Sequence, residues 1–148
     1  MKRIPHAIIG AATGLVVAHV AQVDPMLPAG IAALGAVLPD IDQRWAPRNL
    51  PLRIGAPARV LEHRGPTHSL LAVVLLAVGF PVLGIPLATG YLSHLLADGL
   101  SYMGVPYLWP LSASRYRLLP YGYRMRSGSL IEYPIALVLL GMAAIAQA

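Results

Sequence analysis

The sequence predicts an all-α protein, a polytopic membrane bundle of about five helices, with four helices as the alternative. One observation is composition: 57% of the 148 residues are hydrophobic, 11% are charged, and the mean hydropathy is +0.65. A soluble domain carries about 25% charged residues. The other observation is that long apolar runs alternate with short polar segments. Residues 1–148 are expected to form a single domain, because this length lies in the usual range for one domain.

The first two apolar segments are predicted to be helices joined by a short turn. The first runs from about Pro5 to Val23, because proline suits the first turn of a helix and Asp24-Pro25 ends one. It lacks an obvious small-residue cleavage site, which favours a membrane helix over a cleaved signal. The second, Met26 to Leu38, is short against the roughly 20 residues that span a bilayer. Whether it crosses fully decides between five helices and four.

Three further helices are predicted between and after two polar loops. The most hydrophobic segment of the chain is predicted to be the third helix. The next helix carries a histidine and an aspartate within an apolar run. The second loop combines tyrosines and a tryptophan with arginines, a composition that favours the lipid headgroup zone. In order, these elements are the loop Gln43 to Pro66, a helix from Thr67 to about Leu87, a helix from Pro86 to Met103, the loop Gly104 to Ile131, and a helix from Tyr133 to Ala146, which Glu132 opens.

The basic residues predict how the bundle is oriented. All 11 of them fall in three groups: Lys2 and Arg3, Arg44 to Arg64, and Arg115 to Arg126. Five passes with a cytoplasmic N-terminus place all three groups on the cytoplasmic side, as the positive-inside rule requires. The protein is therefore expected in the inner membrane with its N-terminus inside. The net charge of +5 is explained by this pattern, so we expect no nucleic-acid partner.

His94 and Asp98 suggest a metal site. They stand four residues apart, so a helix places both on one face, where they can bind one cation together. The predicted topology brings further donors to the same membrane side. Together with His94 and Asp98 they make eight groups: His6, Asp40, Asp42, His63, His68, His94, Asp98 and Glu132. The chain has no cysteine, so nitrogen and oxygen ligands favour Zn²⁺, with Mn²⁺ or Fe²⁺ as alternatives.

The motifs that carry these groups resemble one known family. They are Leu38-Pro39-Asp40-Ile41-Asp42, His63-Arg64-Gly65-Pro66-Thr67-His68-Ser69, and Gly90-x-x-Ser93-His94-x-x-x-Asp98. With His6 and Trp109-Pro110-Leu111, they resemble the LexA-binding, inner-membrane-associated metal-dependent hydrolases over about residues 1 to 140. That family is related more distantly to zinc-dependent phospholipase C, whose all-helical fold includes a His-x-x-x-Asp helix at a site of several zinc ions. The resemblance implies that His94 and Asp98 are ligands, although this chain offers few histidines for a three-zinc site.

The resulting hypothesis is metal-dependent hydrolysis of a phosphoester in a lipid or lipid-linked substrate at the cytoplasmic face. The expected metal ligands are Asp40, His68, His94 and Asp98, with His6 and His63 next. Asp42 is the expected general base or a support for a ligand, and Arg64 is expected to bind an anionic oxygen in a bidentate fork. Glu132 is expected to orient a ligand histidine. The substrate and the oligomeric state stay open.

Two other classes of function remain as alternatives. An ion-coupled or proton-coupled transporter would carry polar groups through the membrane depth. A non-catalytic scaffold would use the metal only to tie its helices together, with a closed set of four ligands. His19 and Asp24 are expected to lie apart from the site, His19 as a packing or interfacial residue and Asp24 in a solvated turn.

Overall fold

The computed structural model describes residues 3–40, 66–126 and 128–147, and within them the chain is all-α. It contains five α-helices and no strand in these ranges, which confirms the prediction of an all-α chain with about five helices. The α-helices are α1 (Arg3–Ala21), α2 (Met26–Gly35), α4 (Leu70–Gly79), α5 (Gly84–Gly99) and α6 (Glu132–Ile145); the short 3-10 helices are η2 (Pro66–His68) and η3 (Tyr121–Tyr123).

The predicted third helix is wrong in both length and end. It was expected to continue from Thr67 to about Leu87, but α4 starts at Leu70 and stops at Gly79. The Ser69 side chain caps its first turn by accepting from the Ala72 amide at 3.3 Å. Phe80 leaves helical geometry at φ −127°, and the following Pro81 has no amide hydrogen to continue a helical ladder. The other four helices were predicted with boundaries a few residues away from those observed.

One described helix is long and apolar enough to cross a membrane. It is α1, with 19 residues. The helices α2 and α4 have 10 residues each, α6 has 14 and α5 has 16. At a rise of about 1.5 Å per residue they are roughly 15–24 Å long, which is less than the hydrocarbon core of about 30 Å. The five-pass topology therefore stays a prediction.

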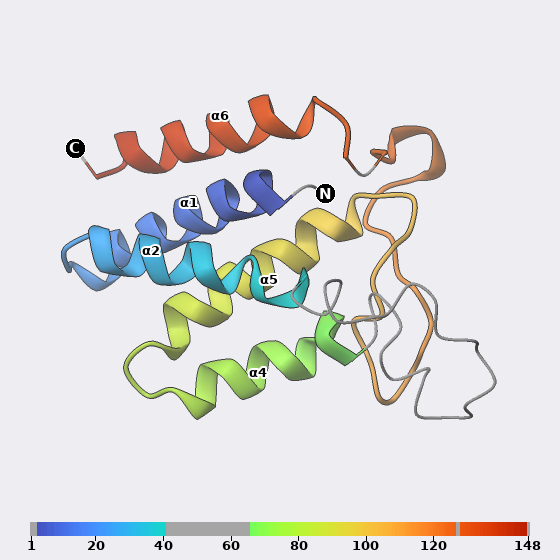
Figure 1. The fold of residues 1–148 in the computed structure, drawn as a ribbon, viewed down its shortest axis with the longest axis horizontal. Helices are drawn as coiled ribbons and strands as arrows, with labels where there is room; N and C mark the ends of the chain where they lie inside the picture. The colour runs from blue at the N-terminus through green and yellow to red at the C-terminus, as the bar shows by residue number, and fades with distance from the viewer. Residues whose placement is uncertain (1–2, 41–65, 127, 148) are drawn as a thin grey trace, which may run out of the picture.

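The helices are arranged so that five of their ends meet on one side (Figure 1). Helix α1 packs against α2, α5 and α6, and α5 also packs against α2 and α4. Helices α1 and α6 run parallel, and the turns after α1 and α4 reverse the chain direction. Arg3, Asp40, His68, Gly99 and Glu132 consequently lie towards the same end, which we call the donor end.

Small residues allow α2 to approach α1 and α5 closely. A Cβ atom added at Gly90 of α5 would lie 1.9 Å from the Ala32 carbonyl oxygen of α2. One added at Gly10 of α1 would lie 2.5 Å from the Ala36 Cβ. Such small-residue contacts are typical of helices that associate in membranes, where backbone proximity and van der Waals packing replace the hydrophobic effect.

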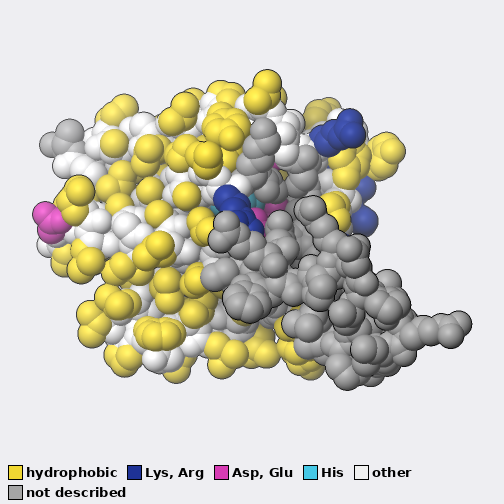
Figure 2. All heavy atoms as spheres, viewed as in Figure 1, with side chains coloured by type: hydrophobic (Ala, Val, Ile, Leu, Met, Phe, Trp, Pro, Cys, Tyr) yellow, Lys and Arg dark blue, Asp and Glu magenta, His cyan; other side chains and the backbone are white. Residues whose placement is uncertain are grey.

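The apolar surface is consistent with a lipid environment. Helix α4 is entirely apolar and none of its residues is buried. Val74, Leu75 and Val78 are between 56% and 75% exposed. Figure 2 shows hydrophobic side chains spread over most of the visible described surface, with Lys and Arg side chains towards the donor end. An uncovered apolar helix of this kind is costly in water and favourable in lipid.

The segment after α5 folds back onto the end of that helix. The Leu118 amide donates to the Gly99 carbonyl at 2.9 Å, and the Met125 amide donates to the Leu100 carbonyl at 3.0 Å. The Tyr107 hydroxyl donates to the Leu95 carbonyl at 2.9 Å. These bonds attach the predicted second polar loop to the helix that carries His94 and Asp98.

Candidate metal centre

Three histidines and two aspartates gather in the interior of the donor end. His6 lies on α1, Asp40 on the 3-10 turn after α2, His68 on η2, and His94 and Asp98 on α5. All five residues are at most 3% exposed. Residues separated by up to 92 positions in the sequence therefore meet in one buried cluster, which we call the donor cluster.

The ligand atoms of the donor cluster are close enough to share a cation. The Nε2 atoms of His68 and His94 are 3.3 Å apart. The His94 Nε2 lies 3.7 Å from both Asp40 Oδ1 and Asp98 Oδ2. The corresponding distances from His68 Nε2 are 4.0 and 3.9 Å. Two ligands held about 2.0–2.2 Å from one ion in tetrahedral geometry lie roughly 3.3–3.6 Å apart.

The orientation of His94 is fixed by the backbone of α2. Its Nδ1 lies 2.7 Å from the Ala36 carbonyl oxygen. A carbonyl oxygen can only accept, so Nδ1 carries the hydrogen and the Nε2 of the neutral ring presents its lone pair to the cluster. Histidine ligands of metal ions commonly donate their second ring nitrogen to a carbonyl or carboxylate in this way.

His68 is oriented by groups in its own short helix. Its Nδ1 lies 3.1 Å from the Thr67 hydroxyl oxygen, which leaves Nε2 directed at His94. The Thr67 carbonyl accepts a hydrogen bond from the Tyr91 hydroxyl of α5. This bond joins η2 to α5, the helix that carries His94 and Asp98, so it fixes the position of His68 relative to His94.

The His6 ring packs against His94 and has no hydrogen bond to the described residues. Its ring stacks on that of His94 with the centroids 3.8 Å apart and an interplanar angle of 21°. Its Nε2 lies 3.5 Å from Asp98 Oδ1. Neither ring nitrogen has a hydrogen-bond partner among the described residues. A buried polar atom without a hydrogen bond costs free energy, and a cation bound by the ring would remove this cost.

The donor cluster fits a divalent metal ion. Its residues form two groups whose ligand atoms all lie within 4.8 Å of one another: His6, His94 and Asp98, and Asp40, His68 and His94. Two carboxylates with neutral histidines would balance the charge of a divalent cation. The mixture of imidazole and carboxylate donors without thiolate suits Zn²⁺, Mn²⁺ or Fe²⁺.

For four predicted site residues, membership of this cluster is not tested. Asp42, His63 and Arg64 lie outside the described residues. Glu132 lies at the donor end, fully buried, and its Oε1 accepts from the Gly128 amide at 2.7 Å. Its predicted role towards a ligand histidine is not tested by any described contact with the donor cluster.

His19 and Asp24 lie outside the cluster, as expected. Both are exposed. The Asp24 carboxylate accepts from the Met26 amide at 2.9 Å and so supports the turn into α2.

Several supporting groups were missed from the sequence. The Ala36 carbonyl carries no sequence signal, because every residue has one. Arg3 donates to the Asp40 carbonyl at 3.2 Å and joins the start of α1 to the end of α2; it was interpreted only as a topology signal. Ser69 caps α4, and the Thr67 hydroxyl lies against His68 Nδ1. The adjacency of Thr67 to His68 was the available signal for its contact.

Comparisons with known proteins assign the chain to a membrane protein family. A family model described as YdjM inner membrane protein matches residues 1–147. The inner membrane protein YdjM of Escherichia coli K12 is 44% identical over 93 residues, which cover 53% of this chain and 47% of that protein. The chain thus aligns with about half the length of that relative. The uncharacterized protein YvsG of Bacillus subtilis is 34% identical over 145 residues, 93% of this chain and 86% of that protein.

No solved structure matches the chain. The match to an inner membrane protein family agrees with the apolar surface and with the length of α1. Neither the family description nor the name of YvsG states a catalytic activity. The chain belongs to the YdjM inner membrane protein family.

Proposed function

We propose that the protein is a membrane-bound metal-dependent hydrolase that cleaves a phosphoester in a lipid or lipid-linked substrate. The proposal rests mainly on one observation. The Nε2 atoms of His68 and His94 are buried and 3.3 Å apart, and each lies within 4.0 Å of a carboxylate oxygen of Asp40 and of Asp98. The resemblance to LexA-binding, inner-membrane-associated metal-dependent hydrolases and, more distantly, to zinc-dependent phospholipase C supports the reaction class.

The proposed roles follow the chemistry of each residue. Asp40, His68, His94 and Asp98 hold the metal ion, Zn²⁺ before Mn²⁺ or Fe²⁺, and His6 and His63 are the additional ligands. When bound, a divalent cation polarises a phosphoryl oxygen and supplies an activated water. Hydrolysis breaks one P–O ester bond, adds water across it, and leaves an alcohol and a phosphate.

The remaining polar residues are proposed to handle the proton and the substrate. Asp42 accepts the proton of the attacking water as general base. Arg64 binds the phosphate oxygens in a bidentate fork. Glu132 orients a histidine of the site from the start of α6.

The substrate class is proposed from the position of the site. The donor cluster lies at the end of the bundle where α1, the one membrane-length helix within the described residues, begins. With all 11 basic residues assigned to the cytoplasmic side of a multi-pass topology, the site would lie near the cytoplasmic headgroups. A lipid headgroup with a phosphoester is the substrate that such a location offers.

The rival functions make different demands on the donor cluster. A transporter would distribute its ionisable groups through the membrane depth, whereas the described donors gather at one end of the bundle. A structural metal site would bind its ion without turnover. The scaffold alternative therefore needs a direct test of turnover.

The first experiment measures metal in the purified, detergent-solubilised protein by mass spectrometry. We expect a stoichiometric divalent metal in the wild type and its loss in His94→Ala and Asp98→Ala. His19→Ala and Asp24→Ala are the matched controls, because they change the same residue types outside the cluster. A wild type without stoichiometric metal would reject the hydrolase proposal.

The second experiment measures hydrolysis of a panel of lipids in mixed micelles, with phosphatidic acid, common phospholipids and isoprenoid phosphates. We expect release of phosphate or a headgroup phosphate ester, abolished by chelation and by Asp98→Ala. Bound metal with all these lipids intact would favour the scaffold and count against the enzyme.

A further inference from the structure

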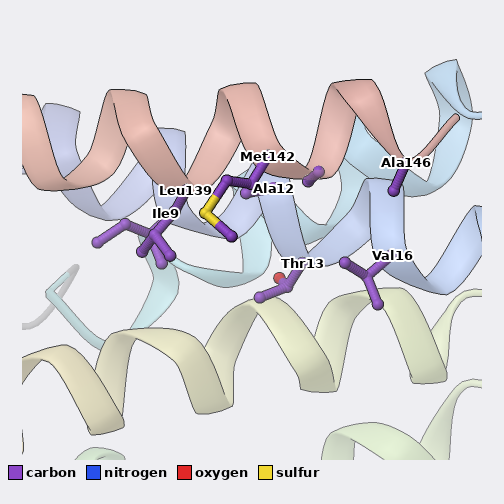
Figure 3. A pocket seen from close by; sticks show the side chains of 8 residues that line it. Ile9, Ala12, Thr13, Val16, Leu139, Met142 and Ala146 are labelled. Carbon is purple, nitrogen blue, oxygen red and sulfur yellow. The ribbon is translucent and has the colours of Figure 1, made fainter. Parts of the chain in front are cut away.

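An apolar groove runs along the contact between α1 and α6. Its α1 wall includes Ile9, Thr13 and Val16, and its α6 wall includes Leu139, Met142 and Ala146. The volume of the groove is about 310 Å³. Figure 3 shows Ile9 near one end and Ala146 near the other, with side chains from both helices between them. From Ile9 to Val16 the groove follows α1 for about 10 Å at the helical rise.

The chemistry of the groove selects an apolar ligand. Thr13 contributes the one hydroxyl among its lining side chains, and this hydroxyl donates to the Gly10 carbonyl of its own helix at 2.8 Å. No lining side chain therefore offers a charge or an unused hydrogen-bond donor. A polar headgroup would lose its hydration here without compensation, whereas methylene groups would gain about 0.8 kcal/mol each on burial.

The two walls are joined near both ends. Near the donor end, Ile9 packs with Ala97 of α5 and Ala136 of α6 in one buried cluster. Near the opposite end, the Gln147 side chain donates to the Leu15 carbonyl at 2.9 Å. The groove is thus a built feature of the fold rather than a gap between separating helices.

The groove leads to the donor cluster. Ile9 at its end lies three residues, just under one helical turn, from His6. It also contacts Ala97, the neighbour of Asp98. One layer of side chains therefore separates the groove from two of the buried ligands. The groove extends from this point along two parallel helices away from the donor end (Figure 3, and Figure 1 for the helix directions).

We infer that the groove binds a hydrocarbon chain of the lipid whose phosphoester head lies at the donor cluster. This inference rests on the proposed function and adds the tail site to the head site. The geometry favours a lipid over a second copy of the protein, because the groove runs from the polar cluster along α1, which among the described helices is the one long and apolar enough to cross a membrane. A lipid presents the same order, with a charged head at one end and an apolar chain directed into the bilayer.

The experiment uses the full-length protein in phosphatidylcholine nanodiscs with a phosphatidic acid probe that carries a diazirine on one acyl chain. After photolysis, mass spectrometry locates the label. We expect it to concentrate on Ile9, Thr13 and Met142, and unlabelled phosphatidic acid to compete it away. Labelling of Val74 and Leu75 on α4, which are exposed and apolar, reports bulk lipid and should not respond to the competitor.

Two matched variants test whether the groove itself is responsible. Val16→Trp places a large ring on the groove wall, and Val20→Trp makes the same exchange one turn further along α1, outside the lining residues. Displacing two methylene groups is worth about tenfold in affinity. We expect Val16→Trp to reduce groove labelling about tenfold and Val20→Trp to leave it unchanged, with equal metal content in both.

Each contrary outcome identifies what has failed. Equal, non-competable labelling of the groove and α4 would mean bulk lipid only and would overturn the tail site. An unlabelled groove in a protein whose copies crosslink through α6 would overturn it in favour of a second copy. Wild-type protein without metal would overturn the proposed hydrolase, while competable groove labelling in that sample would still support a lipid-chain site.

Discussion

The Nδ1–H of His94 donates to the Ala36 carbonyl at 2.7 Å, so the backbone of α2 sets which nitrogen of a histidine on α5 faces the donor cluster. The bond is possible because α2 and α5 approach so closely that a Cβ at Gly90 would meet the Ala32 carbonyl. Helix packing and ligand orientation are therefore coupled.

Removal of bound metal should lower the melting temperature. A ligand at 100 times its Kd that binds only the folded state stabilises it by about 2.7 kcal/mol, which corresponds to roughly 5–10 °C for a chain of this size. Differential scanning fluorimetry of detergent-solubilised protein before and after chelation measures the shift, and re-addition of Zn²⁺ should reverse it. The Asp98→Asn variant should have the same melting temperature with and without chelator. A wild type that is indifferent to chelation would contradict a metal centre.

His6→Phe should separate the ligand role of His6 from its packing role. Phenylalanine can keep the stack on His94 but removes two buried ring nitrogens that have no described hydrogen-bond partner. Since such atoms cost about 1–3 kcal/mol when buried, the metal-free variant should be at least as stable as the metal-free wild type. Its metal affinity should fall, because a donor is lost. Titration with Zn²⁺ and thermal melts measure both quantities, and unchanged affinity would exclude His6 as a ligand.

Thr67→Val should weaken metal binding without unfolding the protein. The exchange keeps the side-chain volume but removes the hydroxyl that lies 3.1 Å from His68 Nδ1. Loss of such a supporting hydrogen bond typically reduces metal affinity by about 10–100-fold. Thr89→Val is the matched control, because the Thr89 hydroxyl bonds only within its own helix, to the Pro86 carbonyl. Equal affinities in the two variants would show that the Thr67 hydroxyl does not position His68.

Gly90→Ala should destabilise the fold and loosen the site together. The new Cβ would lie 1.9 Å from the Ala32 carbonyl oxygen, so α2 and α5 must move apart, at a cost of about 1–3 kcal/mol for overpacking. Gly141→Ala in α6 meets nothing within 4 Å and should stabilise by about 0.5–1 kcal/mol through helix propensity. Melting temperatures measure the contrast. If Gly90→Ala melts like wild type and keeps its metal, the close contact of α2 and α5 is dispensable.

The general plan of the bundle could be predicted because its determinants are local. Apolar runs bounded by Asp24-Pro25 and by polar loops define most of the helices, and short connections force neighbouring helices to run in opposite directions. This alternation brings His6, Asp40, His68 and Asp98 to one end. The break at Phe80 was missed because the chain stays apolar on both sides of that residue.

The fine geometry of the site could not be predicted, because it depends on contacts between distant backbones. The stack of His6 on His94 and the bond from His94 to Ala36 both follow from how α1, α2 and α5 cross. Glycine and alanine residues permit these crossings, but sequence spacing does not determine their depth or angle. Periodicity identified which residues share a helix face, and three-dimensional packing determined which atoms meet.

The position of the donor cluster along the chain has a consequence for biosynthesis. All five of its residues precede Gly99, whereas α6 begins at Glu132. Because a nascent chain emerges from its N-terminus and folds in that order, every ligand is synthesised before α6 exists. A metal ion could therefore reach the donor cluster before α6, which forms the second wall of the groove, has been made.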